Sequence, residues 1–121
     1  GGGINTYCAG CREKHIDDLR TTAYADYLRA VAAAAHAGSE DELRGAKRDA
    51  ADAKARIAVY GRGRVVRALA RFEETGAILS HGHSGTAFVS MVGTMRPSGD
   101  VVSDCEMTLL LLGPAHHEGP R

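Results

Sequence analysis

The chain has 121 residues, with 15 acidic and 15 basic side chains and therefore no formal net charge at pH 7. This length favours one domain, and the balanced charge gives no overall attraction to nucleic acid. The chain has no tryptophan, four tyrosines and two phenylalanines. Its three cysteines do not form the even, spaced set of a secreted disulfide framework, which indicates a reducing compartment. No apolar run approaches the ~20 residues that cross a bilayer.

Helix one is predicted over residues 12–37, after a flexible lead-in at 1–11 that has no helical period. Its apolar positions form one stripe: Ile16, Leu19, Ala23, Tyr24, Tyr27, Leu28, Val31 and Ala35. At 1.5 Å per residue the helix would be ~39 Å long, against ~33 Å for the helix that follows. We therefore expect its N-terminal turn to overhang and its side chains to need cover from another surface. The predicted interface residues are Ile16, Leu19 and Tyr24.

The strongest helical pattern follows at residues 40–60. Ser39 and Glu42 have the spacing of a capping box, in which the Ser39 hydroxyl accepts from a backbone N–H and Glu42 reaches back to the N–H of Ser39. Two charged pairs at i,i+4 spacing support the same helix: Glu40–Arg44 and Asp52–Arg56. The apolar seam is rich in alanine and favours close packing with an antiparallel neighbour: Leu43, Ala46, Ala50, Ala53, Ile57 and Tyr60.

Three shorter helices complete the prediction, at 64–75, 85–96 and 104–112. The last begins at a second capping box, Ser103 to Glu106, and would place Met107, Leu110 and Leu111 as a lid on the bundle. The fold class is therefore all-α, an antiparallel bundle of four main helices and a short C-terminal helix. One domain is expected over 12–113, followed by a disordered tail at 114–121.

Several segments resemble a group of small, uncharacterised bacterial helical proteins. The segments that carry the resemblance are 23–31, 53–61, 67–73, 95–96, 102–104 and 112–113. The resemblance implies an upstream transmembrane anchor, a basic juxtamembrane stretch and a cytoplasmic helical domain. It implies no catalytic residues. The sequence departs from the group at Arg62-Gly63-Arg64, where a polar N-cap is expected before helix three.

Two sets of residues could bind a metal or catalyse a reaction. Cys8, Cys11 and His15 have the spacing of half a zinc site. A fourth ligand would have to come from a distant residue, and two thiols on a lead-in are the simpler interpretation; the distant candidates are Cys105, His116 and His117. His81 and His83 precede Ser84 in a Gly-rich loop, where imidazoles are usually solvated.

Four arginines form a basic edge at the start of helix three: Arg62, Arg64, Arg67 and Arg71. Together with exposed backbone donors they could hold a phosphate. The Gly-Arg-Gly-Arg run is not a phosphate-loop motif, and no aromatic residues interleave for base stacking. A solvated helix face, or attraction to an anionic membrane surface, is the commoner meaning of such an edge.

The sequence therefore leaves three functional hypotheses. The first is a non-enzymatic helical module that associates with itself or with a protein partner, at the cytoplasmic face of a membrane if the implied anchor exists. The second is phosphate or nucleic-acid binding through the arginine edge, with nucleic acid disfavoured by the zero net charge. The third is a small zinc protein or hydrolase that uses the cysteine and histidine residues.

Overall fold

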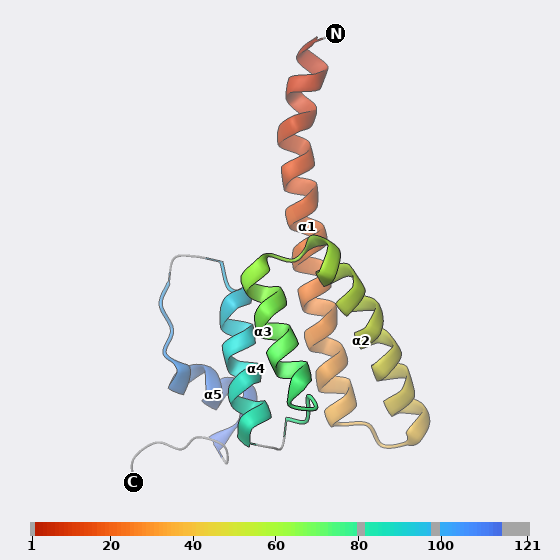
Figure 1. The fold of residues 1–121 in the computed structure, drawn as a ribbon, viewed down its shortest axis with the longest axis vertical. Helices are drawn as coiled ribbons and strands as arrows, with labels where there is room; N and C mark the ends of the chain where they lie inside the picture. Colours follow the sequence, from red (N-terminus) through yellow and green to blue (C-terminus); the bar gives the residue numbers. More distant parts are fainter. Residues whose placement is uncertain (1, 80–81, 98–99, 115–121) are drawn as a thin grey trace. The chain divides into compact units, whose positions relative to one another are not determined.

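The computed structural model describes residues 2–79, 82–97 and 100–114, with side chains from Arg12 onward in these ranges. They contain five α-helices and no strand (Figure 1). The predicted all-α class is therefore confirmed for the described residues. The chain divides into two compact units, Gly1–Arg62 and Gly63–Arg121. The finer predictions of a four-helix antiparallel bundle and of one domain over 12–113 stay predictions, and the tail from residue 115 lies outside the described residues.

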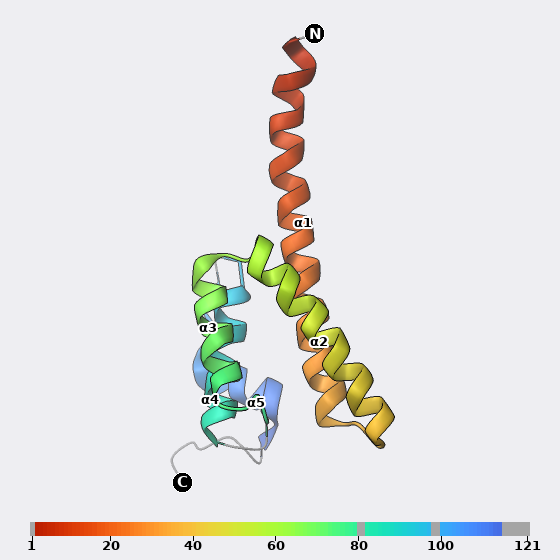
Figure 2. The same cartoon turned by 45° about the vertical axis from the view of Figure 1, so that its right-hand side comes forward.

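The first unit is a pair of antiparallel helices, α1 (Gly2–Ala35) and α2 (Glu40–Tyr60), joined by residues 36–39 (Figures 1 and 2). So short a joint forces consecutive helices to lie side by side. The predicted bounds of α2 are confirmed. Helix α1 begins at Gly2 instead of residue 12 and ends at Ala35 instead of 37. The segment predicted as a flexible lead-in is thus helical from Gly2.

Small side chains dominate the buried surface of this helix pair. On α1 the buried residues include Ala23, Ala30 and Tyr27, and α2 buries Ala46, Ala53 and Ile57. Alanine at such positions lets two helix backbones approach closely. The alanine-rich seam predicted for α2 is confirmed, since none of its six residues is exposed. On α1 the predicted stripe ends too late, because Ala35 is exposed.

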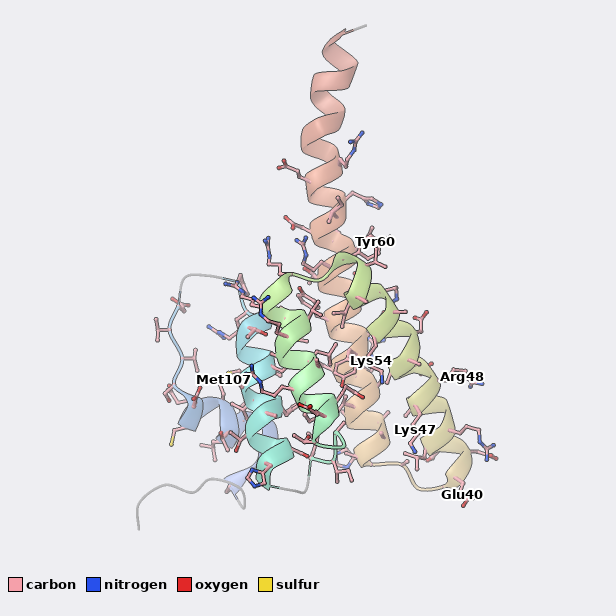
Figure 3. All side chains as sticks on the ribbon, viewed as in Figure 1. Glu40, Lys47, Arg48, Lys54, Tyr60 and Met107 are labelled. Carbon is pink, nitrogen blue, oxygen red and sulfur yellow. The ribbon has the colours of Figure 1, made fainter. Side chains whose placement is uncertain are left out.

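Helix α2 begins with a modified capping box. The Ser39 hydroxyl accepts from the N–H of Glu42 at 3.2 Å, as predicted. The Glu42 carboxylate, however, accepts from the N–H of Gly38 at 3.0 Å instead of that of Ser39. The Glu42 carboxylate therefore caps the N–H of the residue before the N-cap, and not that of the N-cap itself. Beyond this turn α2 exposes Glu40, Lys47 and Arg48 (Figure 3).

The second unit contains α3 (Gly63–Glu74), α4 (Gly82–Met95) and α5 (Asp104–Leu112). Helix α4 packs against both α3 and α5. The rings of Phe72 on α3 and Phe88 on α4 lie 5.3 Å apart at an interplanar angle of 50°, a favourable tilted contact. Other buried apolar side chains of this unit are aliphatic or contain sulfur: Val65, Ala68, Leu69, Val89, Met91 and Met107.

Helix α4 begins at Gly82, three residues before the predicted start at 85. The Gly-rich sequence there indicated a loop, but Ser84 is buried and its hydroxyl donates to the Thr75 hydroxyl at 2.7 Å. The Thr75 hydroxyl in turn donates to the carbonyl of Phe72 at 2.6 Å. These bonds tie the first turn of α4 to the end of α3, and hydrogen bonding of this kind makes the burial of a hydroxyl tolerable.

Helix α5 keeps its predicted bounds and its capping box, with both halves formed between Ser103 and Glu106. The predicted lid is only partly formed. Met107 is buried, but Leu110 is 80% exposed. The nine-residue helix therefore buries a narrower apolar face than its composition suggests. Among the described residues, no helix combines the length and the apolar character that a membrane span requires.

Candidate functional site

A charged pocket of about 330 Å³ lies between α1 and α2. The small side chains of Ala30 and Ala33 leave the space, and charged side chains surround it. The charged lining residues are Asp26 and Arg29 from α1 and Asp49, Asp52 and Arg56 from α2. A pocket of this size could hold a small ligand, so the state of its charged groups decides what it can do.

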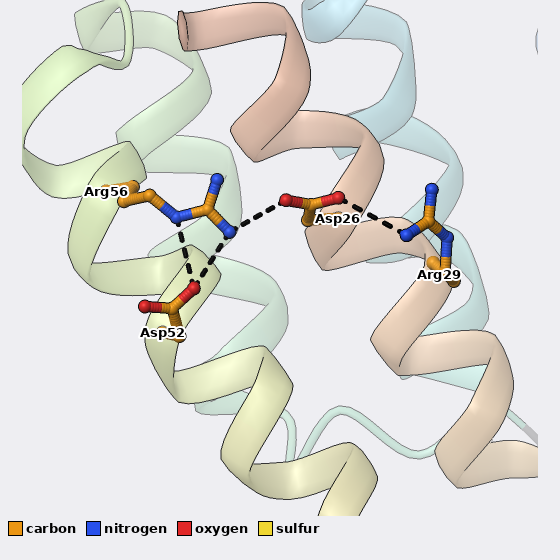
Figure 4. Close-up of polar contacts among 4 residues, drawn as sticks. All are labelled: Asp26, Arg29, Asp52 and Arg56. Atoms are coloured by element: carbon orange, nitrogen blue, oxygen red, sulfur yellow. Dashed lines mark hydrogen bonds and ion pairs between the residues drawn. The ribbon is translucent and has the colours of Figure 1, made fainter.

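Arg56 is the centre of the polar contacts in this pocket (Figure 4). Its Nε and Nη2 donate to Asp52 Oδ2 at 3.1 and 2.9 Å, and Nη2 also donates to Asp26 Oδ2 at 2.8 Å. The other oxygen of Asp26 lies 3.5 Å from Arg29 Nη1. Hydrogen bonds from Arg56, first to Asp26 and then to Asp52, raise the pKa of its guanidinium above the ordinary value. The guanidinium therefore stays charged at any physiological pH.

This arrangement is suited to holding the two helices together. Arg56 joins α2 to α1 through Asp26, and two N–H groups of one guanidinium on one carboxylate fix its orientation. Because the donors and acceptors engage one another, a ligand would have to displace them. Across the described residues, no group of three or more His, Cys, Asp or Glu side chains could hold a metal ion. Because Arg56 joins α2 to α1 through Asp26, we interpret the pocket as an interhelical clamp.

A second polar network marks the place where α2 ends beside α1. Arg20 Nε donates to the carbonyl oxygen of Tyr60 at 2.7 Å, and its Nη1 contacts Asp17 at 2.5 Å. The N–H of Arg62 donates to the hydroxyl oxygen of Tyr24 at 3.1 Å. Tyr24 is buried. It therefore packs within the helix pair, and its predicted part in an interface with a partner stays a prediction.

Helix α1 continues well beyond this network (Figures 1 and 2). From Arg20 back to Gly2 it extends 18 residues, or ~27 Å at 1.5 Å per residue. Neither view shows α2 beside this segment, which we call the free half of α1, residues 2–19. Of the predicted interface residues, Ile16 and Leu19 lie in it and are half-buried. The sequence correctly indicated an overhang but made it too short.

Only some residues of the predicted metal site have side chains that the structure describes. The side chains of Cys8 and Cys11 lie outside the described set, and His15 is exposed on α1. Cys105 is exposed on α5, and His83 is exposed in the first turn of α4. The other predicted candidates lie outside the described residues: His81, His116 and His117. The zinc site stays a prediction that the structure does not advance.

The predicted arginine edge is divided between the two units. Arg62 belongs to the first unit, where its Nη2 lies 3.8 Å from Asp17. Arg64, Arg67 and Arg71 are exposed on α3, at spacings of three and four residues that place them on one helix face. A joint site of all four stays a prediction. The α3 arginine row, residues 64, 67 and 71, is the part that one helix brings together.

The contact that sequence reasoning missed is that between Asp26 and Arg56. The two residues are 30 positions apart, so no local spacing connects them. The available signal was the position of Asp26, a carboxylate on the flank of the apolar stripe of α1. Comparison with known proteins finds no family model, no curated relative and no solved structure that matches this chain.

Proposed function

We propose that the chain is a non-enzymatic interaction module that self-associates through the free half of α1. The observation that carries this proposal is the length of α1, which begins 18 residues before the point where α2 ends beside Arg20. A helix that continues past α2 offers a long surface to another molecule. The charged pocket has no part in this function, because the Arg56 guanidinium is already engaged by Asp26 and Asp52.

The sequence of the free half supports the need for a partner. It contains three glycines, at positions 2, 3 and 10. Gly10 lies in the helix interior, where glycine costs roughly 1 kcal/mol relative to alanine, whereas Gly2 and Gly3 lie in the first turn. In proteins most helical stability comes from packing of one face against other elements rather than from intrinsic propensity. Packing against another helix is the usual source of the missing stability, and a second copy supplies such a helix wherever the chain is present.

A helix-breaking substitution in the free half tests the proposal. Glu13 is exposed, and proline there removes a helical hydrogen bond and clashes with the preceding turn, at a cost of ~3 kcal/mol. We expect Glu13→Pro to abolish self-association in sedimentation velocity, while the helix pair α1–α2 remains folded by circular dichroism. Glu13→Ala is the matched control and should associate like the parent chain. Association of the proline variant at parental strength would contradict the proposal.

Anion binding by the α3 arginine row is a second candidate function. In the first unit Arg20, Arg44 and Arg56 all contact carboxylates, whereas the described residues give the three α3 arginines no such contact. Exposed guanidiniums in a row attract phosphate groups. Retention on heparin should fall to lower salt when Arg67 becomes glutamine and should change little when Arg48, also exposed, does. Equal effects of the two substitutions would assign the retention to general charge alone.

A further inference from the structure

We propose that two copies of the chain pair in antiparallel orientation along the outward face of α1, with a twofold axis beside residue 16, so that Lys14 of each copy meets Asp18 of the other. The inference rests on the proposed self-association and goes further by naming the partner, the orientation and the seam.

The outward face of α1 is a continuous row of exposed residues. Lys14, Asp18, Thr21 and Ala25 follow one another at spacings of four, three and four, and all four are exposed. This spacing keeps residues on one side of a helix. The buried residues of α1, such as Ala23 and Tyr27, lie on the other side. The row is therefore available while α1 and α2 stay packed together.

The spacing of the row is the same in both directions. Extended by sequence position, it runs 7, 11, 14, 18, 21, 25, with steps of four, three, four, three and four. A row with this spacing meets itself in register when two copies run antiparallel about a midpoint of the row, and the midpoint at residue 16 is the one that pairs Lys14 with Asp18. The facing positions are then Tyr7 with Ala25, Cys11 with Thr21, and Lys14 with Asp18.

Charge decides the orientation. In an antiparallel pair each Lys14 faces an Asp18, so the twofold axis repeats one favourable ion pair twice. In a parallel pair Lys14 would face Lys14 and Asp18 would face Asp18, and like charges at such positions repel. Neither side chain contacts a group of opposite charge among the described residues, so both are available to a second copy. The face is thus complementary to itself in one orientation.

A charge-swap experiment with the full chain tests this seam. The variants Lys14→Glu and Asp18→Lys each place like charges opposite one another in their own homodimer. We expect the dimer dissociation constant of each to rise about tenfold or more in sedimentation equilibrium, since two ion pairs become two repulsive contacts. An equimolar mixture of the two variants restores both ion pairs and should dimerise like the parent chain, as should the double variant.

Charge changes elsewhere on α1 serve as controls. Arg12→Glu and Glu13→Lys make the same charge changes on other sides of α1 and should leave the dimer intact, since both residues are exposed and outside the row. If the single variants dimerise like the parent, or the mixture stays dissociated, this seam is wrong while self-association stands. If the parent chain is monomeric at every concentration, the proposed function itself fails.

Discussion

The two halves of α1 belong to one continuous helix but differ in what stabilises them. The paired half packs against α2 through buried residues such as Ala23 and Tyr27 and is tied to it by the Asp26–Arg56 ion pair. The described part of the free half has only exposed or half-buried side chains, and its remainder contains three glycines. Continuity of a helix therefore does not mean uniform stability. One half is stabilised by the chain itself, and we propose that the other is stabilised by a second copy.

The largest effect is expected from a cavity in the paired half. Ile57 is fully buried, and truncation of a buried isoleucine to alanine costs about 2–5 kcal/mol. Ile57→Ala should therefore lower the midpoint of urea unfolding strongly. Val59, two residues on, is 74% exposed, and Val59→Ala should change the stability by less than about 0.5 kcal/mol. Similar losses from both substitutions would show that the burial on α2 differs from that described.

The ion-pair clamp should have the next largest effect. Arg56→Met leaves the carboxylates of Asp26 and Asp52 without their shared guanidinium, so the thermal midpoint should fall. Arg44→Met removes a guanidinium whose pair with Asp41 is largely exposed, and such pairs contribute little. Added salt should narrow the difference between the two variants, because it screens charges. Equal midpoints for both variants at low salt would show that the pocket does not act as a clamp.

Two glycines of the helix pair should respond to alanine substitution in opposite ways. Gly45 lies inside α2, and a methyl group there would meet only the Arg48 guanidinium at 3.8 Å, an ordinary contact. Gly45→Ala should therefore raise the stability by up to about 1 kcal/mol. At Gly61 a methyl group would lie 2.5 Å from the Ile57 carbonyl oxygen, so Gly61→Ala should destabilise the same helix pair. Chemical denaturation of both variants measures the change in the free energy of unfolding. A change of the same sign in both variants would contradict this geometry.

The smallest effect concerns a helix end that the chain stabilises without a partner. The N–H and hydroxyl of Ser103 donate to the Glu106 carboxylate at 3.0 and 2.9 Å and lower its pKa below the usual range of glutamate. This contribution to α5 is complete above the pKa of glutamate in the unfolded chain. It is lost as the pH falls through the lowered pKa of the folded state. Amide chemical shifts of α5 should follow this titration and should not depend on protein concentration.

The matched variant is Glu106→Gln, whose amide oxygen still accepts a hydrogen bond but does not titrate over this range. It should remove the acid-dependent step. Persistence of that step in the variant would assign it to another group. A dependence on protein concentration would mean that α5, like the free half of α1, draws stability from a second molecule.

The sequence predicted the helices best where local chemistry marks both ends. Helices α2 and α5 begin after Ser39 and Ser103, each with glutamate three residues later, and their bounds agree with prediction. Helix α1 was predicted to begin too late because its first residues are rich in glycine and have no apolar period. Helix α4 was also predicted too short, because the bond from Ser84 to Thr75 joins two helices and leaves no trace in local spacing.

Polar contacts could likewise be predicted within one helix but not between two helices. The pair Asp52–Arg56 follows from i,i+4 spacing and is confirmed, whereas Arg44 contacts Asp41 instead of the predicted Glu40. Neighbouring carboxylates compete for one guanidinium, and rotamers that the sequence does not specify decide between them. The contact of Arg56 with Asp26 depends on the register of two helices. Local spacing therefore indicated one side of the clamp but could not reveal the other.

Hydrogen exchange at several protein concentrations tests the central claim most directly, because it reports each amide of α1 separately. The account predicts that amides in residues 2–19 exchange rapidly in dilute solution and become protected as concentration rises. Amides in residues 23–35 should be protected throughout, since their protection comes from α2. Exchange in the free half that is independent of concentration would contradict self-association as the source of its stability.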